Sequence, residues 1–577
     1  MDAEWKGVAV SLFCVACVSV FLLKWRELQN LKRKLQRARE KREKELGQAE
    51  KAVSCFKTQN AGVDLSSIVT LPLAELSKRI RDGSLQPDAV LHAYMEKALE
   101  ANRKVNCSTA VLTESLKQLQ DIESHKNGLL YGIPISIKDN LDFEGYDSTC
   151  GVLTKLDDPA VKDSVLVSVL KKQGAIPFIK TNIPQGLLNY ECSNPIYGRT
   201  VNPCNVEKTC GGSSGGEGAL IAGGGSILGL GSDLGGSVRI PAAFCGICGL
   251  KPTNNRISLH GLSSCVKGGK TGKTPTSVGP MARDVESLAL CMRALLCPDM
   301  FTLDPTVPPI PFNQQVYESS EPLRIGYYEN DGYFQPSPSM SRALLETKEL
   351  LEKAGHTLIP FNLPRIFTAF HEFVVRGNTA DGCVTLLKHF EEGPVDPCMQ
   401  HQFRHWGCPR FVKMFSLLLR PVYPRMAAVI HATCGVRRTA VSDVASSHFF
   451  LCSLLCSSPA ALWKQHREVE DYIRETIAVS LSSAALSYTA LYNVLNFPAG
   501  VVPVTEVTAE DEDQLNHYSR YFGDAGDKTF FEAIRGGVGL PIAVQCVALP
   551  WQEEMCLRLM REVEKLCAKN KFSNTHH

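Results

Sequence analysis

The sequence predicts one large α/β domain. Short apolar runs at residues 129–137, 175–179 and 542–547 contain alternating or β-branched residues and predict buried strands. Longer periodic stretches at residues 72–99 and 338–354 predict helices between them. The 577 residues contain no internal repeat, and no Pro-rich stretch is long enough to mark a domain boundary. Strands mixed with helices along the whole chain favour a single α/β core.

The first element in chain order is an apolar N-terminal helix. Residues 7–23 form an uncharged run of 17 residues, at the lower limit of the length that crosses a bilayer. Trp and Lys bracket the run on both sides, as residues that anchor at the membrane interface do. A cleaved signal peptide is the alternative, but the strong basic cluster follows the run and no small-x-small cleavage site is present. We therefore expect residues 1–30 to be a single-pass membrane anchor.

The next segment, residues 31–64, is predicted to be a basic helical linker. Residues 24–52 are rich in Lys, Arg, Glu, Gln and Leu and contain no Gly or Pro before Gly47, which favours an exposed helix near anionic lipid. The positive-inside rule places this side of the anchor in the cytosol. Nucleic-acid binding is the alternative for a basic run, but the whole chain carries a net charge of only +2. We expect no nucleic-acid partner.

A glycine-rich region follows the second predicted strand. Twelve glycines fall between Gly211 and Gly236, a density that favours tight turns close to a small ligand. A flexible linker is the alternative, but the apolar runs at 219–222 and 227–230 indicate that the region is packed inside the domain. A phosphate-binding loop is disfavoured, because GxxxxGK[ST] is absent.

Two serine-based catalytic sites fit this region. Ser213 lies in a loose GxSxG pattern typical of α/β-hydrolases, which also needs an acid and a histidine downstream, and no histidine stands out. Lys138 ends an apolar run that predicts a buried strand, although a solvated lysine at a strand end is the commoner case. If buried among hydroxyls, Lys138 would lose its charge and act as a base. Two serines and this lysine would then form a Ser-Ser-Lys relay.

These segments carry a family resemblance. The runs GIPISIKDN (132–140), GGSSGG (211–216), GGSVRIPAAFCG (235–246) and GLKPT (249–253) follow one another in the order found in the amidase signature family. Over residues 65–565 the chain resembles that family and, within it, the animal fatty acid amide hydrolases. The resemblance implies an amidase signature fold, a twisted mixed β-sheet covered by helices, with residues 65–577 as the catalytic domain.

The resemblance also implies roles for individual residues. Ser237 would be the nucleophile, Ser213 a bridging serine that follows a cis peptide bond, and Lys138 the base. Support for the loops would come from Ser214 and Arg239. The backbone amides that would hold the oxyanion are those of Leu234, Gly235, Gly236 and Ser237. No metal or cofactor is implied, and the single CxxC pair, Cys245 and Cys248, is expected to pack in the core, as are most of the 22 cysteines, in reduced form.

The resemblance further implies the activity: hydrolysis of fatty acid amides, such as N-acylethanolamines and oleamide, to a fatty acid and an amine or ammonia. Residues 403–432 interleave apolar and basic side chains and form a candidate membrane-interface cap, with an ordinary pair of core helices as the alternative. The expected partners are a long-chain fatty acid amide, membrane lipid and a second copy in a homodimer, at the endoplasmic reticulum or another endomembrane. Two alternatives remain: an amidase for small amides or glutamine, and a lipid-binding membrane protein without catalysis.

Overall fold

The computed structural model describes residues 2–264, 275–378, 383–388, 390, 393–407, 480–482, 486–518, 523 and 525–574. At residues 2–13 it describes the backbone but not the side chains. From position 408 onward, the candidate cap at 403–432 lies outside the described residues, so the structure does not test it.

One large sheet runs through the molecule. Its eleven strands, in spatial order, are β1 (Ser108–Val111), β3 (Ile176–Thr181), β2 (Pro134–Lys138), β6 (Leu228–Asp233), β8 (Ser277–Ala282), β7 (Cys248–Lys251), β12 (Ala499–Glu506), β13 (Pro541–Val547), β11 (Ser480–Ser482), β9 (Arg324–Tyr327) and β10 (Thr357–Pro360). A separate pair is formed by β4 (Ser193–Asn194) and β5 (Gly198–Arg199). Strand β2 runs parallel to both of its neighbours, β3 and β6. From β6 onward, each of the pairs β6–β8, β8–β7, β7–β12 and β12–β13 is antiparallel. The sheet is mixed, as expected.

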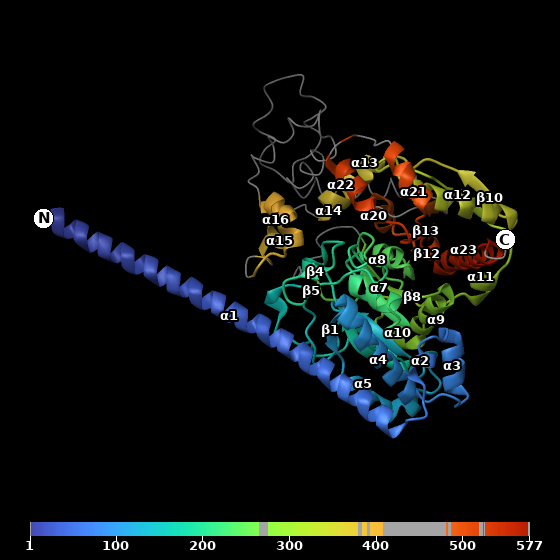
Figure 1. The fold of residues 1–577 in the computed structure, drawn as a ribbon, viewed down its shortest axis with the longest axis horizontal. Coiled ribbons are helices and arrows are strands. Elements are labelled where there is room, and N and C mark those ends of the chain that lie inside the picture. The colour runs from blue at the N-terminus through green and yellow to red at the C-terminus, as the bar shows by residue number, and fades with distance from the viewer. Residues whose placement is uncertain are drawn as a thin grey trace, which may run out of the picture.

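Helices surround this sheet (Figure 1). They are α1 (Asp2–Gln59), α2 (Leu65–Ile68), α3 (Leu73–Arg81), α4 (Pro87–Val105), α5 (Glu114–Gln118), α6 (Val165–Lys172), α7 (Gly215–Ala222), α8 (Arg239–Cys245), α9 (Val285–Leu295), α10 (Pro298–Leu303), α11 (Gln314–Glu318), α12 (Pro338–Lys353), α13 (Ile366–Thr368), α14 (Arg376–Asn378), α15 (Val384–Lys388), α16 (Gln400–Gly407), α20 (Leu486–Val494), α21 (Ala509–Gln514), α22 (Ala525–Ile534) and α23 (Glu553–Asn574).

Both faces of the sheet are covered. Gly249 on β7 faces helix α8, since a Cβ there would meet Ala242 at 2.9 Å. The next residue, Leu250, pairs with Gly500 on β12, so these two residues share the other face. A Cβ at Gly500 would collide with the Met560 sulfur of α23. Successive residues of a strand point to opposite faces. Helices α8 and α23 therefore lie on opposite sides of the sheet, both closely packed against glycines that leave room for them.

The predicted elements are largely present, with shifted boundaries. The strand expected at 129–137 begins only at Pro134, because Gly132 has a φ of +73° and turns the chain just before it. The single helix expected at 72–99 is two helices, α3 and α4. Gly83, at φ +80°, ends the first, and Pro87 begins the second at its first turn.

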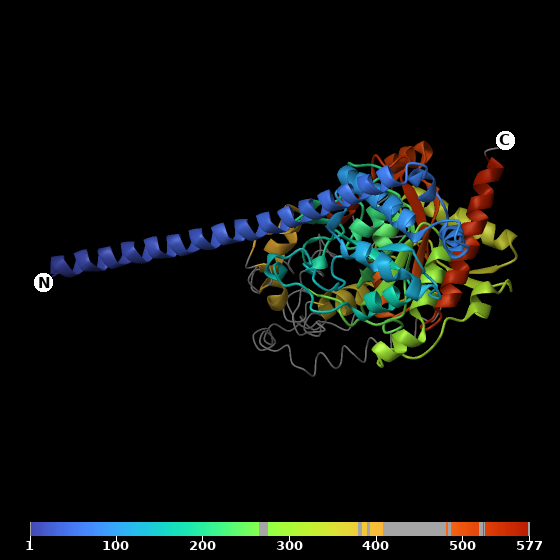
Figure 2. The ribbon, with the colours of Figure 1, turned by 90° about the horizontal axis from the view of Figure 1, so that it is seen from below.

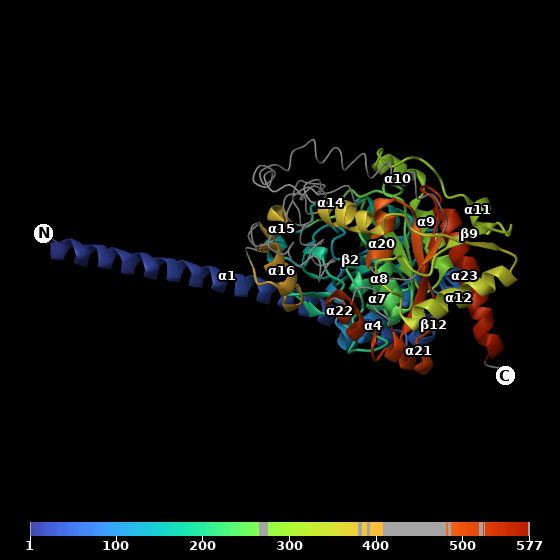
Figure 3. The same cartoon turned by 90° about the horizontal axis from the view of Figure 1, so that it is seen from above.

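Helix α1 runs without a break from residue 2 to residue 59, and its N-terminal part projects well beyond the sheet and its helices (Figures 1, 2 and 3). Its second half lies against the rest of the protein. Phe56 stacks on His92 with ring centroids 4.4 Å apart, and Arg39 donates to the Ile196 carbonyl at 2.8 Å. The segment at residues 24–52, expected to be an exposed helix, is partly buried on one side from residue 31 onward.

The apolar run at residues 7–23 of the expected membrane anchor (residues 1–30) falls within α1. The structure describes the side chains of this run only from residue 14 onward. Across the described part of the chain, none of the helices combines the length and the apolar character that crossing a membrane requires. The structure therefore does not support the predicted transmembrane helix.

Candidate active site

The sheet brings two strand ends together at one edge. Strand β2 ends at Lys138 and β6 ends at Asp233, and the two strands are parallel neighbours in which Ile137 lies opposite Leu230. The carboxyl ends of parallel strands lie at the same edge of a sheet, and the loops that follow them often form sites there. The residues after β6 therefore begin beside Lys138.

Lys138 is fully buried and surrounded by hydroxyl and carbonyl oxygens. Its Nζ lies 2.7 Å from Ser213 Oγ, 2.9 Å from Ser232 Oγ and 3.1 Å from the Ser232 carbonyl oxygen. None of these partners carries a charge. Burial lowers the pKa of Lys138 to about 7, although the Asp233 carboxylate acts in the opposite direction. A large fraction of this lysine is therefore a neutral amine near pH 7.

The three oxygens match the bonding capacity of a neutral amine. Such an amine has two N–H groups and one lone pair. The Ser232 carbonyl can only accept, and the Ser232 hydroxyl donates its own proton to Asn140 Oδ1 at 3.4 Å, so its oxygen also accepts. The two N–H groups of Lys138 are thus used by Ser232. When charged, Lys138 donates to all three oxygens; in the neutral form, with both N–H groups on Ser232, its lone pair would face Ser213 Oγ and could take up the Ser213 proton.

Ser213 and Ser214 begin the turn into α7. The Gly212–Ser213 peptide bond is cis, as the resemblance implies. Ser214 donates its backbone N–H to the Ser237 carbonyl at 3.0 Å, and its hydroxyl is 3.4 Å from the Ser232 carbonyl oxygen. These contacts tie the loop that carries Ser213 to the loop that carries Ser237. The structure thus joins Lys138 to Ser213, and the Ser213 loop to the Ser237 loop. A hydroxyl–hydroxyl bond between Ser213 and Ser237 is not among the contacts of the described residues.

Ser237 lies in the short loop between β6 and α8 and is partly exposed, unlike the buried Lys138 and Ser213. The backbone amides of Leu234, Gly235 and Ser237 donate no hydrogen bond to any acceptor within the described residues. Gly236 differs, because its amide donates to Asp233 Oδ1 at 2.7 Å. Three of the four amides expected to bind an oxyanion are therefore free to do so, and the fourth is already engaged.

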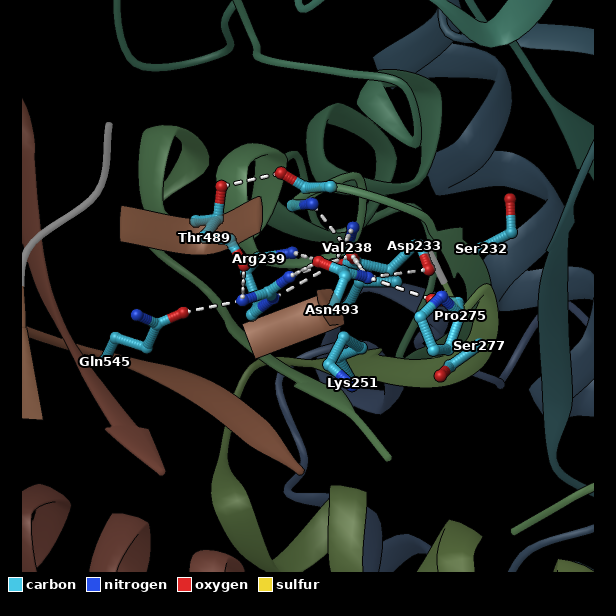
Figure 4. Close-up of polar contacts among 12 residues, drawn as sticks. Ser232, Asp233, Val238, Arg239, Lys251, Pro275, Ser277, Thr489, Asn493 and Gln545 are labelled. Carbon is cyan, nitrogen blue, oxygen red and sulfur yellow. Dashed lines mark hydrogen bonds and ion pairs between the residues drawn. The ribbon is translucent and has the colours of Figure 1, made fainter. Parts of the chain in front are cut away.

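A buried ion pair closes the base of this loop (Figure 4). Arg239 and Asp233 are both fully buried, and the guanidinium donates to the carboxylate through Nη2 at 2.9 Å and Nε at 3.1 Å. The Val238 amide donates to the same carboxylate at 3.0 Å. Although burial acts to raise the pKa of Asp233, Arg239 holds it well below its usual range. Asp233 therefore stays ionised and fixes the two ends of the loop.

The network extends to the far end of the chain. Arg239 Nη1 donates to Gln545 Oε1 on β13 and to the Thr489 carbonyl on α20, both at 2.8 Å.

Sequence reasoning selected Arg239 but missed Ser232, Asp233, Thr489, Asn493 and Gln545. Ser232 and Asp233 stand in the quoted glycine-rich region, and their position just before the loop was an available signal. Nothing in the local pattern around Thr489 or Asn493 connects them to a loop about 250 residues earlier in the chain.

The CxxC cysteines have separate partners. Cys245 Sγ contacts the Cys210 carbonyl oxygen at 3.3 Å, and Cys248 Sγ contacts Glu564 Oε1 at 3.7 Å. Both side chains are buried. They lie in the packed core on either side of the α8–β7 turn.

Comparison with known proteins assigns the family. The model of the Amidase family matches residues 89–557. The chain belongs to the amidase family. This amidase is 48% identical to fatty-acid amide hydrolase 1 of Sus scrofa, over 97% of this chain and 96% of that protein. It is 51% identical to vitamin D3 hydroxylase-associated protein of Gallus gallus, over 76% of this chain and 94% of that protein.

A solved structure of a fatty acid amide hydrolase shares the amidase fold. The TM-score is 0.73 at 24% identity, and the alignment covers 93% of this chain and 95% of the other. This likeness confirms the expected amidase signature fold, a large mixed sheet with helices on both faces. As a member of the amidase family, the chain is an enzyme that cleaves amides.

Proposed function

We propose that this amidase hydrolyses fatty acid amides through Ser237, Ser213 and Lys138. The observation that carries the proposal is the buried contact of 2.7 Å between Lys138 Nζ and Ser213 Oγ, beside a loop that presents a partly exposed serine. A lysine with a pKa near 7 is suited to accept and return a proton at neutral pH. An apolar core does not need such a lysine, because burial of an amine costs stability unless it is paired.

The first step forms an ester. Ser237 Oγ attacks the amide carbonyl carbon, its proton passes to Ser213 Oγ, and the Ser213 proton passes to the lone pair of Lys138. The carbonyl oxygen becomes an oxyanion, which the free amides of the loop stabilise. The C–N bond then breaks as Lys138 returns a proton through Ser213 to the leaving nitrogen. The acyl group remains on Ser237, and the amine leaves neutral.

The second step repeats this path with water. A water molecule gives a proton to the relay, attacks the ester carbonyl and releases the fatty acid, and Ser237 regains its proton. The engaged Gly236 amide suggests that the oxyanion is held by the amides of Leu234, Gly235 and Ser237. Gly236 would instead support the loop through Asp233.

The fatty acid part of the proposal rests on the similarity to the Sus scrofa enzyme, whose name gives that activity. The test is hydrolysis of oleamide, a long-chain N-acylethanolamine and a short-chain amide by the full-length chain. We expect the long-chain amides to give a kcat/KM at least about tenfold higher, because each buried CH₂ contributes about 0.8 kcal/mol.

A preference for the short amide or for glutamine would favour the alternative of a small-amide amidase. A chain that binds the lipid amides but turns over none of the three would instead favour the lipid-binding alternative.

We also propose that the N-terminal part of α1 attaches the enzyme to a membrane. Large apolar side chains at positions 15, 18, 20–23, 25 and 28 of this projecting helix are 49% to 68% exposed. A continuous apolar surface of this kind usually contacts lipid or another protein. A cytosolic catalytic domain, an endomembrane location and a homodimer stay predictions, as do the domain limits at residues 30 and 64.

The double variant Phe21→Glu and Trp25→Glu tests this attachment. We expect it to reduce flotation with phosphatidylcholine–phosphatidylserine vesicles at least about tenfold, since both charges would have to enter the lipid interface. The control is Val161→Glu with Val538→Glu, at two apolar positions that are 89% and 55% exposed elsewhere. Equal flotation of all three proteins would refute attachment through α1. Release by alkaline carbonate would show that the attachment is peripheral.

A further inference from the structure

Helix α20 lies directly against the Ser237 loop, although about 250 residues separate them in the sequence (Figure 4). Thr489 and Asn493 are four residues apart on this helix and so share one face. Both side chains are fully buried, and both form hydrogen bonds to the loop or to the residues at its ends. This face of α20 is therefore part of the surroundings of the nucleophile.

Thr489 fixes one peptide group of the loop. Its hydroxyl donates to the Gly235 carbonyl oxygen at 2.7 Å. The N–H of the same peptide group belongs to Gly236 and donates to Asp233 Oδ1 at 2.7 Å. The peptide between Gly235 and Gly236 is thus held at both of its polar atoms and cannot rotate without losing two hydrogen bonds.

Gly236 allows this close approach. Its φ is +126°, a region that residues with side chains rarely adopt, and a Cβ there would lie 2.4 Å from Thr489 Oγ1. The loop and the helix are therefore in direct contact at this point. A movement of Thr489 would be transmitted to the loop.

Asn493 connects the two ends of the loop. Its Nδ2 donates to the Asp233 carboxylate at 3.0 Å and to the Asp233 carbonyl oxygen at 3.2 Å. Its Oδ1 accepts from Arg239 Nη2 at 2.6 Å. One side-chain amide thus holds the residue before the loop and the residue two positions after Ser237.

We infer that Thr489 and Asn493 are positioning residues that hold the Ser237 loop with its free amides aimed at the developing oxyanion. Fixing the 235–236 peptide leaves the neighbouring amides of Gly235 and Ser237 in one orientation. Donors that are fixed before the reaction stabilise an oxyanion without paying for reorganisation, so a loosened loop reacts more slowly even when substrate binds normally. The inference rests on the proposed function only in taking Ser237 as the nucleophile.

The test compares Thr489→Val with Thr489→Ser. Valine keeps the shape of threonine but removes the hydroxyl donor, whereas serine keeps the donor. The readout is the second-order rate at which a fluorophosphonate labels Ser237. In this reaction a P–O bond to Ser237 forms, the Ser237 proton passes to the relay, the P–F bond breaks and fluoride leaves. The phosphoryl oxygen gains charge at the same amides. We expect Thr489→Val to slow labelling about tenfold and to lower kcat with KM within about twofold.

Thr489→Ser should label within about threefold of the wild-type rate. The matched control is Thr347→Val, since Thr347 is a buried threonine whose hydroxyl donates to the Ala343 carbonyl in α12 at 2.7 Å. It should label like wild type, even if its melting temperature falls. Should Thr489→Val not fold, Thr489→Ala and Thr489→Ser provide the same comparison.

The inference would be overturned if the folded variant without the hydroxyl, Thr489→Val or Thr489→Ala, were labelled at the wild-type rate. Slowed labelling by that variant, in an enzyme that turns over no fatty amide, would uphold it and refute only the proposed substrate. Absence of label on wild-type Ser237 would refute the nucleophile and the positioning role together, and would be recognised before any variant is compared.

Discussion

Ser237→Ala is expected to lower kcat for amide hydrolysis by about 10⁴-fold or more and to abolish fluorophosphonate labelling. In the proposed mechanism no acyl-enzyme can form without the Ser237 hydroxyl, and the activity that remains would come from binding and the oxyanion donors alone. Removing this hydroxyl should leave the fold intact, because its oxygen forms no hydrogen bond within the described residues and the side chain is partly exposed. The measurement is oleamide hydrolysis alongside the melting temperature.

Ser226→Ala is the matched control for this variant. Ser226 lies in the same glycine-rich region, is buried and donates to the Leu228 carbonyl at 2.9 Å, but it touches neither Lys138 nor Ser213 among the described contacts. Its hydrolysis rate should stay within a few-fold of wild type. Substantial activity in Ser237→Ala would show that another group is the nucleophile and would reject the proposed mechanism.

Lys138→Ala is expected to lower amide hydrolysis by about 10² to 10⁴-fold and to lower hydrolysis of the matching ester much less. An amine leaves only after its nitrogen is protonated, and in the proposed relay Lys138 returns this proton through Ser213. An alkoxide is a better leaving group and depends less on this step. The measurement is kcat for oleamide and for methyl oleate in each variant. Equal losses for both substrates would contradict the relay.

The pH dependence separates this role from packing. In the proposed mechanism the neutral form of Lys138 is the base, and burial lowers its pKa to about 7, so wild-type activity should rise as the pH increases through 7. In Lys138→Ala this rise should disappear. Lys138→Met fills the buried space better than alanine, so it should show the same loss of the rise with less effect on stability. A wild-type profile that stays flat between pH 6 and 8 would contradict the assignment of Lys138 as the base.

Much of the fold could be predicted because its core strands have simple patterns. The apolar runs that end at Lys138 and at Val547 are strands whose burial is visible in their composition. The order of eleven strands could not be predicted in this way, because neighbours such as β6 and β8, or β7 and β12, are chosen by packing between distant segments. The basic segment at residues 24–52 was expected to be exposed, and this was wrong for one of its sides, because a stripe of apolar residues lies among its many charges.

That stripe lies along one side of α1. Leu31, Leu35, Ala38, Ala49, Val53 and Phe56 pack against the rest of the protein and are separated mostly by three or four residues or their multiples. Counting this spacing would have revealed the packed face. The total of lysines and arginines indicated only the opposite, solvated face of the same helix.

The residues of the candidate site could be proposed from the sequence only where they lie in recognisable motifs. Lys138, Ser213, Ser237 and Arg239 stand in such motifs. Thr489 and Asn493 stand in an ordinary helix, and their importance to the loop comes from the folding of that helix against it. Hydroxyl and amide side chains are common in helices, so their residue types alone say nothing about a partner 250 positions away.

Helix α1 has one further consequence, which concerns distance and not only attachment. It continues without a break from its packed half into its projecting half. An α-helix turns about 100° and rises about 1.5 Å with each residue, so the exposed apolar side chains at positions 20–23 cover all sides of the helix. The number of residues between this apolar end and the packed half therefore sets the greatest distance from a bound surface at which the active site can be held.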